Sequence, residues 1–400
     1  MAVKKRDNNN DDGFFQFPDD TILEILKRVP AKSLMRFKSA CRGWRDTIAD
    51  PFFVESQRSH ARSQPGGTHL VFYNTQLFYI LLAYIENCGS KLRVVTLSAR
   101  NMNLDVITTT SPPPRDGPHN KPLSHSNVVC GLVCIYIHDF ISTPEGEEPT
   151  LWLLNLTTME KKALPTPRSD DTRHENARCT YFLGLDSLTK HHKILHYHES
   201  ECHVLTVGDK KWSRVLGPIP QQLQVVEAVS MEGRICFKSG NIDLRALTFF
   251  DLNEGKFRHI SYPQDYLPRQ IATGWLRIPY FLQEIFELGG KLGIVDGLRV
   301  WVLEDDNGSW VEKKITLPKD VYNGELVGVK GKNEIIVKSS QGRDVIPRYY
   351  IYDFDTGGCK EEPEISLHDL SFKKYLSQSN ISSRYCSTTL LSYIENITPL

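Results

Sequence analysis

Residues 17–53 read FPDDTILEILKRVPAKSLMRFKSACRGWRDTIADPFF, and this stretch predicts a small helical unit. Pro18 fixes φ at the value of a first helical turn, and the two aspartates after it place negative charge where the helix dipole favours it. One apolar face follows, made of Ile22, Ile25, Leu26 and Val29. Because proline cannot continue a helix, this helix must stop at Pro30.

The apolar spacing of three and four continues beyond Pro30. It is carried by Leu34, Phe37, Cys41, Trp44 and Ile48, with the basic residues Lys32, Arg36, Lys38, Arg42 and Arg45 between them. The stretch therefore predicts three short helices and the start of a fourth. A unit of about 45 residues is small for a stable core of its own. Its large aromatic side chains are therefore as suited to face a partner as to face each other.

Three interpretations fit this pattern when the residues are considered only by type. Short helices with interspersed arginines could form a helix-turn-helix unit that reads DNA, with the basic side chains on phosphates. They could also be a structural cap on the next domain. The third interpretation is a docking unit for another protein, and it depends on the order in which the motifs occur.

That order resembles an F-box. The motifs are Phe-Pro-Asp-Asp, Ile-Leu-Glu-Ile-Leu, Val-Pro-Ala-Lys-Ser-Leu-Met-Arg-Phe-Lys, Cys-Arg-Gly-Trp-Arg and Asp-Pro-Phe-Phe. They are most similar to the F-boxes of a large plant family that carries an F-box-associated domain. Phe17, Ala40 and Gly43 stand where Leu, Val and Ser are usual, and Gly43 costs about 1 kcal/mol of helix stability relative to alanine. These departures bear on how tightly the unit would bind its partner, and not on whether it resembles an F-box.

The resemblance implies that the helices dock on the Skp-type adaptor of a cullin–RING ubiquitin ligase. The residues expected at the adaptor interface, or in the helix packing that shapes it, are Phe17, Pro18, Leu23, Leu26, Leu34, Phe37, Cys41 and Trp44. A large aromatic side chain such as Trp44 is the usual type of interface hot spot.

Composition describes an ordinary globular protein of 400 residues, 40% hydrophobic and 24% charged. Lys plus Arg equals Asp plus Glu at 48 each, so no global field draws the chain to nucleic acid or to a membrane, and neither is expected as a partner. Residues 1–13 are polar, and we expect a disordered tail without a secretory signal. The nine scattered cysteines indicate reduced thiols in the cytoplasm or nucleus.

A weak internal repeat organises the rest of the chain. An apolar strand, a polar turn and often a second strand recur at LWLLNLTTMEKKALP, HVLTVGDKKWSRV, LTFFDLNEGKFRHISYP, VWVLEDDNGSWVEKKITLP and YYIYDFDTGGCKEEP, with a degraded copy near Leu97. The interval is about 50 residues, which suits one four-stranded propeller blade. A glycine turn followed by an apolar strand recurs as CGLVCIY, EGRICFK, GGKLGIV and KGKNEIIVK.

Six copies between residues 67 and 400 predict a mainly-β domain, a six-bladed β-propeller, with a two-sheet β-sandwich as the alternative. A strand within residues 388–397 is expected to pair with residues 70–73 and close the ring, which removes two sheet edges. YFLGLDSLTKHHKILHY and LLSYIENITPL also resemble phrases of the F-box-associated, kelch-like domain. The predicted loops include residues 108–122, 141–149 and 263–279.

Signs of catalytic chemistry are sparse. The sequence contains no nucleophile elbow, no phosphate-binding loop and no dinucleotide fingerprint. His196 and His198 would point the same way from a strand and could hold a metal if Cys202 and His203 turned back toward them. The simpler interpretation is that the histidines form the polar face of a strand. We therefore expect no metal and no cofactor.

The resulting hypothesis has three segments: a tail at 1–13, an F-box at 14–62 and an F-box-associated β domain at 67–400. The chain would be the non-catalytic substrate-recognition subunit of a Skp–cullin–F-box ubiquitin ligase, binding a target whose identity the sequence does not reveal. One rival is an enzyme that uses a propeller's central pocket. The other is a scaffold protein without a ligase role.

Overall fold

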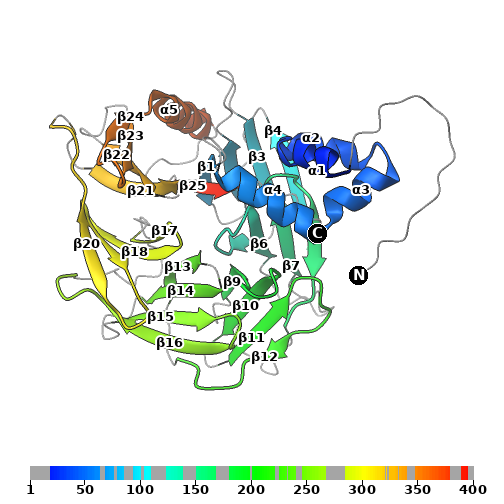
Figure 1. Ribbon diagram of the computed structural model, residues 1–400, viewed down its shortest axis with the longest axis horizontal. Coiled ribbons are helices and arrows are strands. Elements are labelled where there is room, and N and C mark those ends of the chain that lie inside the picture. The colour runs from blue at the N-terminus through cyan, green and yellow to red at the C-terminus, as the bar shows by residue number, and fades with distance from the viewer. Residues whose placement is uncertain are drawn as a thin grey trace.

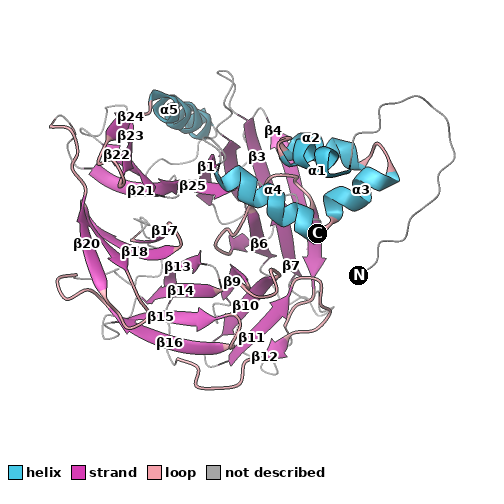
Figure 2. Ribbon diagram, in the orientation of Figure 1, coloured by secondary structure: helices cyan, strands magenta, loops and turns pink. Residues whose placement is uncertain are grey.

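The computed structural model places a group of helices beside a ring of β-sheets (Figure 1). The structure describes residues 19–63, 68–75, 79–84, 93–100, 103–109, 123–137, 150–167, 180–198, 201–220, 225–231, 233–239, 246–266, 284–319, 321, 324–331, 333–339, 347–378 and 389–394. Figure 2 shows that strands make up most of the ring. None of the described helices is long and apolar enough to cross a membrane.

Four helices open the described chain, as the sequence predicts. They are α1 (Asp19–Lys27), α2 (Ala31–Lys38), α3 (Arg42–Ala49) and α4 (Pro51–Ser63). Pro30 separates the first two, with φ −55° and ψ 144°, and its carbonyl accepts hydrogen bonds from the amides of Ser33 and Leu34 in α2. Proline thus ends one helix and begins the next, because it lacks an amide donor but has a φ suited to a helix start.

In the described part of the chain the ring consists of six antiparallel sheets, the blades of a propeller. Each is built from strands consecutive in the chain except where the ring closes. Blade 1 has the order β25-β1-β2-β3-β4, and blades 2 to 6 are β5–β8, β9–β12, β13–β16, β17–β20 and β21–β24. The six-bladed prediction is confirmed. The sandwich alternative is wrong, because the strands form six separate sheets instead of two.

The strands of the first three blades have the following bounds: β1 Thr68–Thr75, β2 Tyr79–Tyr84, β3 Arg93–Arg100, β4 Asn103–Thr109, β5 Leu123–His125, β6 Leu132–Ile137, β7 Thr150–Asn155, β8 Lys161–Leu164, β9 Thr180–Leu185, β10 His192–His198, β11 Glu201–Thr206 and β12 Ser213–Arg214. Those of the last three blades, with the closing strand, are β13 Val225–Met231, β14 Arg234–Ser239, β15 Ala246–Asp251, β16 Lys256–Ser261, β17 Ile285–Leu288, β18 Lys291–Asp296, β19 Arg299–Leu303, β20 Trp310–Lys314, β21 Gly324–Lys330, β22 Glu334–Ser339, β23 Arg348–Asp353, β24 Cys359–Glu361 and β25 Thr389–Ile394.

The sequence repeat corresponds to the outer hairpin of each blade. Its five clear copies are β7–β8, β11–β12, β15–β16, β19–β20 and β23–β24, and the degraded copy near Leu97 lies in β3, next to the outermost strand of blade 1. In three copies the repeated polar residue accepts backbone N–H bonds just beyond the strand: Asn155 from Thr157 and Thr158, Asp251 from Asn253 and Glu254, and Asp353 from Asp355. This bond starts the turn between the two strands, which explains why a polar residue recurs at this position of the repeat.

Apolar contacts join each blade to the next. Between blades 3 and 4, for example, the rings of Phe182 and Phe237 meet edge to face with centroids 4.6 Å apart. Gly184 permits this approach, since a Cβ there would lie 2.5 Å from Cδ1 of Leu252. Similar clusters join blades 1 and 2, 2 and 3, 4 and 5, and 5 and 6. Because both faces of a blade are covered, its inner strands are apolar throughout instead of alternating.

The ring closes through strands from the two ends of the described chain. β25 pairs antiparallel with β1, from Thr68 opposite Ile394 to Tyr73 opposite Thr389, and it also contacts β21 of blade 6. Figure 1 shows β25 between β1 and β21. The predicted pairing of residues 70–73 with the C-terminal strand is therefore confirmed.

A fifth helix, α5 (Pro363–Gln378), lies between β24 and β25 and was not predicted. Its buried positions, Ile365, Asp369 and Phe372, include a carboxylate, so the apolar spacing of a helix is interrupted in the sequence. Cys130 and Gly131 make the turn expected before β6. One other expectation needs correction, because β4 extends two residues into the loop predicted at 108–122.

Several predictions fall outside the described residues. They are the tail at 1–13, Phe17 and Pro18, the rest of the loop at 108–122, and most of the loops at 141–149 and 263–279. α4 ends at Ser63 and β1 begins at Thr68, around the boundary expected at 62–67. The division of the chain into separate domains stays a prediction.

Ring closure can be tested by truncation. A chain ending at residue 388 lacks β25, which leaves the edges of β1 and β21 without their neighbour, and exposed edges promote association. We expect this variant to aggregate and to melt well below the full chain, as measured by light scattering and circular dichroism. A chain ending at Ile394 keeps β25 and serves as the control. If the chain ending at 388 stays monomeric with an unchanged Tm, closure by β25 is not needed for stability.

Candidate functional site

The four N-terminal helices share a small apolar core. It consists of Leu26, Ala31, Leu34, Ile48, Phe53 and Val54, with Ile22, Val29, Phe37 and Trp44 packed against it. The rings of Phe37 in α2 and Trp44 in α3 meet edge to face, with centroids 4.9 Å apart. This contact joins the two helices, and aromatic pairs of this kind contribute about 0.5–1.5 kcal/mol beyond the area that they bury.

Short polar contacts set where α3 and α4 begin. The Sγ atom of Cys41 accepts a hydrogen bond from the Trp44 amide at 3.4 Å, which makes Cys41 the N-cap of α3. Asp50 accepts bonds from the amides of Phe52 and Phe53 at 2.8 and 3.1 Å at the start of α4. Caps of the Asp type stabilise a helix by about 1 kcal/mol. The cap at Asp50 also directs the two phenylalanines, so that Phe53 is buried and Phe52 is 87% exposed.

The predicted adaptor-binding residues differ in how far they are buried. Leu26 and Leu34 are buried and shape the helix packing, and Phe37 and Trp44 are half-buried. Leu23 and Cys41 are exposed. Phe17 and Pro18 lie outside the described residues. Whether any of these side chains binds an adaptor stays a prediction, but only the exposed and half-buried ones have surface to offer.

Two exposed apolar residues of this unit were missed. Ile25 was assigned to the apolar face of its helix, yet it is 52% exposed, and Phe52 was not selected although it is the most exposed large apolar side chain described. Spacing alone did not separate Ile25 from its buried neighbour Leu26. For Phe52, the N-capping aspartate before it was a usable signal, because it fixes which of two adjacent phenylalanines points outward.

The helices lie against one end of the propeller. α4 contacts β25, and its Arg58 is buried and paired with Glu55 at 2.9 Å. Burial and then the nearby Arg58 charge lower the pKa of His192, the first residue of β10, to about 3. Burial also lowers the pKa of Lys38, with Glu160 of the β7–β8 turn opposing the shift. The helical unit therefore brings charged residues close to the propeller, at Arg58 and Lys38.

A buried polar cluster joins the inner strands of blades 4 and 5. Glu284 forms an ion pair with Lys238 and accepts a hydrogen bond from the Tyr266 hydroxyl. Glu227 accepts bonds from the amides of Glu284 and Ile285 at 3.1 and 3.2 Å. Burial raises the pKa of Glu227 to about 8. Shifted carboxyls also occur in active sites, but here both Glu227 oxygens are bonded to the next blade, so the group holds the blades together.

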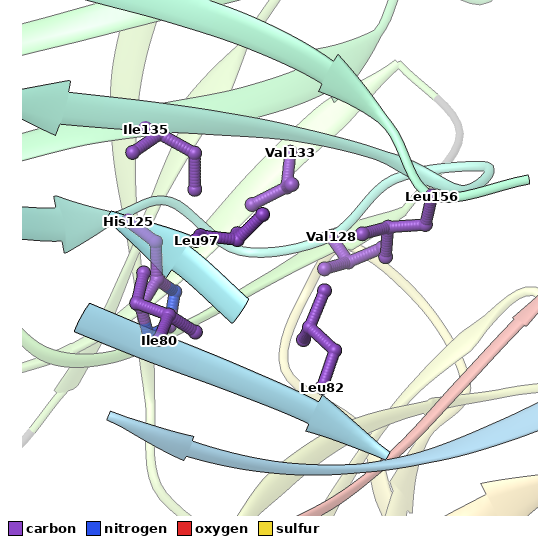
Figure 3. Close-up of a pocket in the computed structure, with 8 residues that line it drawn as sticks. All are labelled: Ile80, Leu82, Leu97, His125, Val128, Val133, Ile135 and Leu156. Carbon is purple, nitrogen blue, oxygen red and sulfur yellow. The ribbon is translucent and has the colours of Figure 1, made fainter. Parts of the chain in front are cut away.

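A cavity between blades 1 and 2 is too small for a ligand. It measures about 30 Å³ and is lined by Ile80, Leu82, Leu97, Val128, Val133, Ile135, Leu156 and His125 (Figure 3). This is the space of about one water molecule, and drug-sized ligand pockets are at least ten times larger. It is therefore a packing gap between blades.

The histidine cluster does not have the arrangement that a metal needs. His196 and His198 lie side by side with parallel rings 6.3 Å apart, as predicted, and the β10–β11 hairpin places His203 opposite His196. Cys202 pairs with Tyr197 and is buried on the other face of the sheet. Within the described part of the chain, no three His, Cys, Asp or Glu side chains could hold a metal ion.

His196 is instead part of an aromatic cluster. It is buried against Tyr181 and Trp212, with centroids 4.8 and 6.0 Å away, and neither ring nitrogen has a hydrogen-bond partner among the described residues. Burial, followed by the neighbouring histidines, lowers the pKa of His196 to about 3. The folded state therefore keeps His196 neutral, whereas the unfolded chain binds a proton below about pH 6.5.

This difference makes stability depend on pH in a defined direction. As pH falls from about 6.5 toward 3, the free energy of unfolding should drop by about 1.4 kcal/mol per pH unit for His196, because only the unfolded state gains the proton. His196→Phe fills the same space without titrating. We expect the variant to match the parent at pH 7 and to exceed its stability at pH 5 in urea titrations.

Two outcomes would contradict this account of the histidines. One is equal acid sensitivity of the variant and the parent. The other is stoichiometric zinc or copper in protein purified without added metal and lost in His196→Gln/His198→Gln, since this would indicate a metal site in place of a polar strand face.

Comparison with known proteins agrees with the geometry. The F-box domain family matches residues 14–55, and the family described as F-box associated beta propeller domain matches residues 90–360. An F-box/kelch-repeat protein of Arabidopsis thaliana is 24% identical over 394 residues, covering 88% of this chain and 82% of the relative. A second F-box protein of Arabidopsis thaliana is 22% identical over 374 residues, covering 84% and 83%.

Among solved structures, the Cps50 (Swd1) beta-propeller domain of Myceliophteria thermophila is similar at a TM-score of 0.35 and 10% identity, covering 72% of this chain and 85% of that one. The family match carries the assignment, since the propeller family spans more than half of the chain and the F-box family spans the helical unit. The chain therefore belongs to the F-box proteins that carry an F-box associated β-propeller domain.

Proposed function

We propose that this protein is the substrate-recognition subunit of a Skp–cullin–F-box ubiquitin ligase. Its helical unit binds a Skp-type adaptor, and through it a cullin, while the β-propeller holds a target protein. The observation that carries the proposal is the joining of an F-box, at residues 14–55, to a propeller of the F-box associated family in one chain.

The proposed role requires no chemistry from this chain. A ligase of this kind gains rate by holding the target's lysines close to a charged ubiquitin carrier, which raises their effective concentration. Such a receptor must hold its two binding surfaces in a defined relation. The contact of α4 with β25 is consistent with this requirement, since it places the helical unit against the strand that closes the ring.

The surface best suited to the adaptor is the exposed apolar part of the helical unit. Leu23, Ile25 and Phe52 are exposed in this unit, and Phe37 and Trp44 are half-buried. Exposed apolar side chains are typical of protein-binding surfaces, and aromatic side chains are common among their hot spots.

The proposal is tested by adaptor binding. A fragment that ends at Ser63 should bind a Skp-type adaptor by itself. In the full chain, Phe52→Glu and Leu23→Glu should each weaken binding tenfold or more, about 1.4 kcal/mol, because a charge replaces an apolar contact. Trp44→Ala should weaken binding by at least as much, because it also removes the Phe37 contact, which contributes about 0.5–1.5 kcal/mol beyond the area that it buries. Isothermal titration calorimetry measures each affinity.

The matched control is Leu188→Glu, which changes a leucine that is 79% exposed in a propeller turn. It should bind the adaptor as the parent does. If the parent chain fails to bind an adaptor, the receptor role is wrong. If the parent binds while the two surface variants bind equally well, the adaptor uses another face of the helices.

A further inference from the structure

The chain that leads into the closing strand β25 passes through α5. This helix ends at Gln378, β25 begins at Thr389, and the whole link between β24 and β25 is residues 362–388. α5 contacts β23 of blade 6, and Figure 1 shows it beside that blade. β25 contacts β21 of the same blade and pairs with β1. The position of α5 on blade 6 therefore limits where the chain that forms β25 can begin.

The joint between blades 4 and 5 shows which polar groups hold two neighbouring blades together. Glu227 of the inner strand β13 lies opposite Lys238 of β14. Lys238 forms an ion pair with Glu284, which directly precedes β17 of the next blade. Glu284 also accepts a hydrogen bond from the Tyr266 hydroxyl. The set thus combines a cross-strand glutamate and lysine with a tyrosine hydroxyl and a carboxylate that the next blade supplies.

Blade 6 repeats this set of groups with one difference. Glu325 of the inner strand β21 lies opposite Lys338 of β22, and in both blades the register shifts close to the glutamate. Nζ of Lys338 lies over the ring of Tyr349 in β23, 5.9 Å from its centroid. The Tyr349 hydroxyl donates a hydrogen bond to Oδ2 of Asp369 at 3.0 Å. The carboxylate of this second set therefore belongs to α5 and not to the next blade.

The strand next to blade 6 has no carboxylate to supply. That strand is β25, and the sequence contains no aspartate or glutamate from residue 370 to residue 394. Asp369 is fully buried. Burial lowers the pKa of Lys338, and Asp369 is the first of the charges that oppose this shift. α5 thus completes at blade 6 the set of polar groups that blade 5 completes for blade 4.

The buried carboxylate fixes α5 in one position on blade 6. Ile365 and Phe372 of this helix are buried, but apolar packing by itself tolerates small shifts. The bond between Asp369 and Tyr349 has a direction, and Lys373 pairs with the same carboxylate oxygen at 2.9 Å. A displaced α5 would leave a buried carboxylate without its partners, which is costly.

We propose that α5 is a latch on ring closure. The bond between Asp369 and Tyr349 holds the chain before β25 against blade 6, and release of α5 frees β25 from β1 and β21. When α5 is held, residues 379–388 alone remain between an anchored helix and β25, so the entropic cost of pairing β25 is smaller than for a free link of residues 362–388. The inference goes beyond the proposed function, since it concerns the opening of the propeller and not the adaptor.

The test measures hydrogen–deuterium exchange in the full chain. Asp369→Asn keeps the size of the side chain and removes its charge, whereas Tyr349→Phe removes the hydroxyl alone. In each variant we expect the amides of β25 to exchange about ten times faster than in the parent, together with those of α5, while β9–β16 exchange as before. Tyr349→Phe is the milder change, and it decides the question if Asp369→Asn does not fold.

The matched control is Tyr266→Phe, which removes the equivalent hydroxyl at the joint between blades 4 and 5. It should speed exchange in β14 and β17 and leave β25 unchanged. Unchanged exchange of β25 in Tyr349→Phe would overturn the inference, because α5 would then only cover blade 6. Equal acceleration of β25 by Tyr266→Phe would also overturn it, because the effect would then be a general loss of stability. Adaptor binding should be that of the parent in all three variants, so the latch and the proposed function can fail separately.

Discussion

The pairing of β25 with β1 is the contact on which the rest of the molecule depends. It joins strands more than 300 residues apart in sequence, from Thr68 opposite Ile394 to Tyr73 opposite Thr389, and it places β25 beside blade 6. A long loop must close before this contact forms, and the entropy of that closure is offset only when all six blades pack. Two helices are attached here, since α4 leads into β1 and α5 leads into β25.

Closure works because neighbouring blades are joined by both apolar and polar contacts. Apolar clusters lie between consecutive blades, and at the rim side chains cross from one blade to the next. Arg234 of blade 4 pairs with Asp306 of blade 5, and the Lys193 ammonium of blade 3 bonds to the Leu252 carbonyl of blade 4 at 2.8 Å. Such polar contacts add little free energy when exposed, but their geometry fixes the rotation of each blade against its neighbour.

Much of this architecture could be predicted from the sequence, because the signals were local and repeated. The helix breaks at Pro30, the turn residues Asn155, Asp251 and Asp353, and the apolar C-terminal strand each determine structure through short-range chemistry. The exposure of individual apolar side chains was less predictable. Ile25 and Leu26 are adjacent and equally apolar, and only the packing of four helices decides which is buried. α5 was missed because a buried carboxylate at Asp369 interrupts the apolar pattern that marks a helix.

The same reasoning explains why buried polar residues determine the arrangement of elements in this protein. A propeller needs apolar residues between its blades, so each buried polar group must hold some element in a single position. Glu227 of blade 4 holds the backbone of blade 5, and Asp369 with Tyr349 positions α5 on blade 6. Apolar packing tolerates several arrangements of similar energy, whereas a displaced buried charge would lose its partners at once. These buried polar groups therefore fix the position of blade 5 relative to blade 4 and of α5 relative to blade 6.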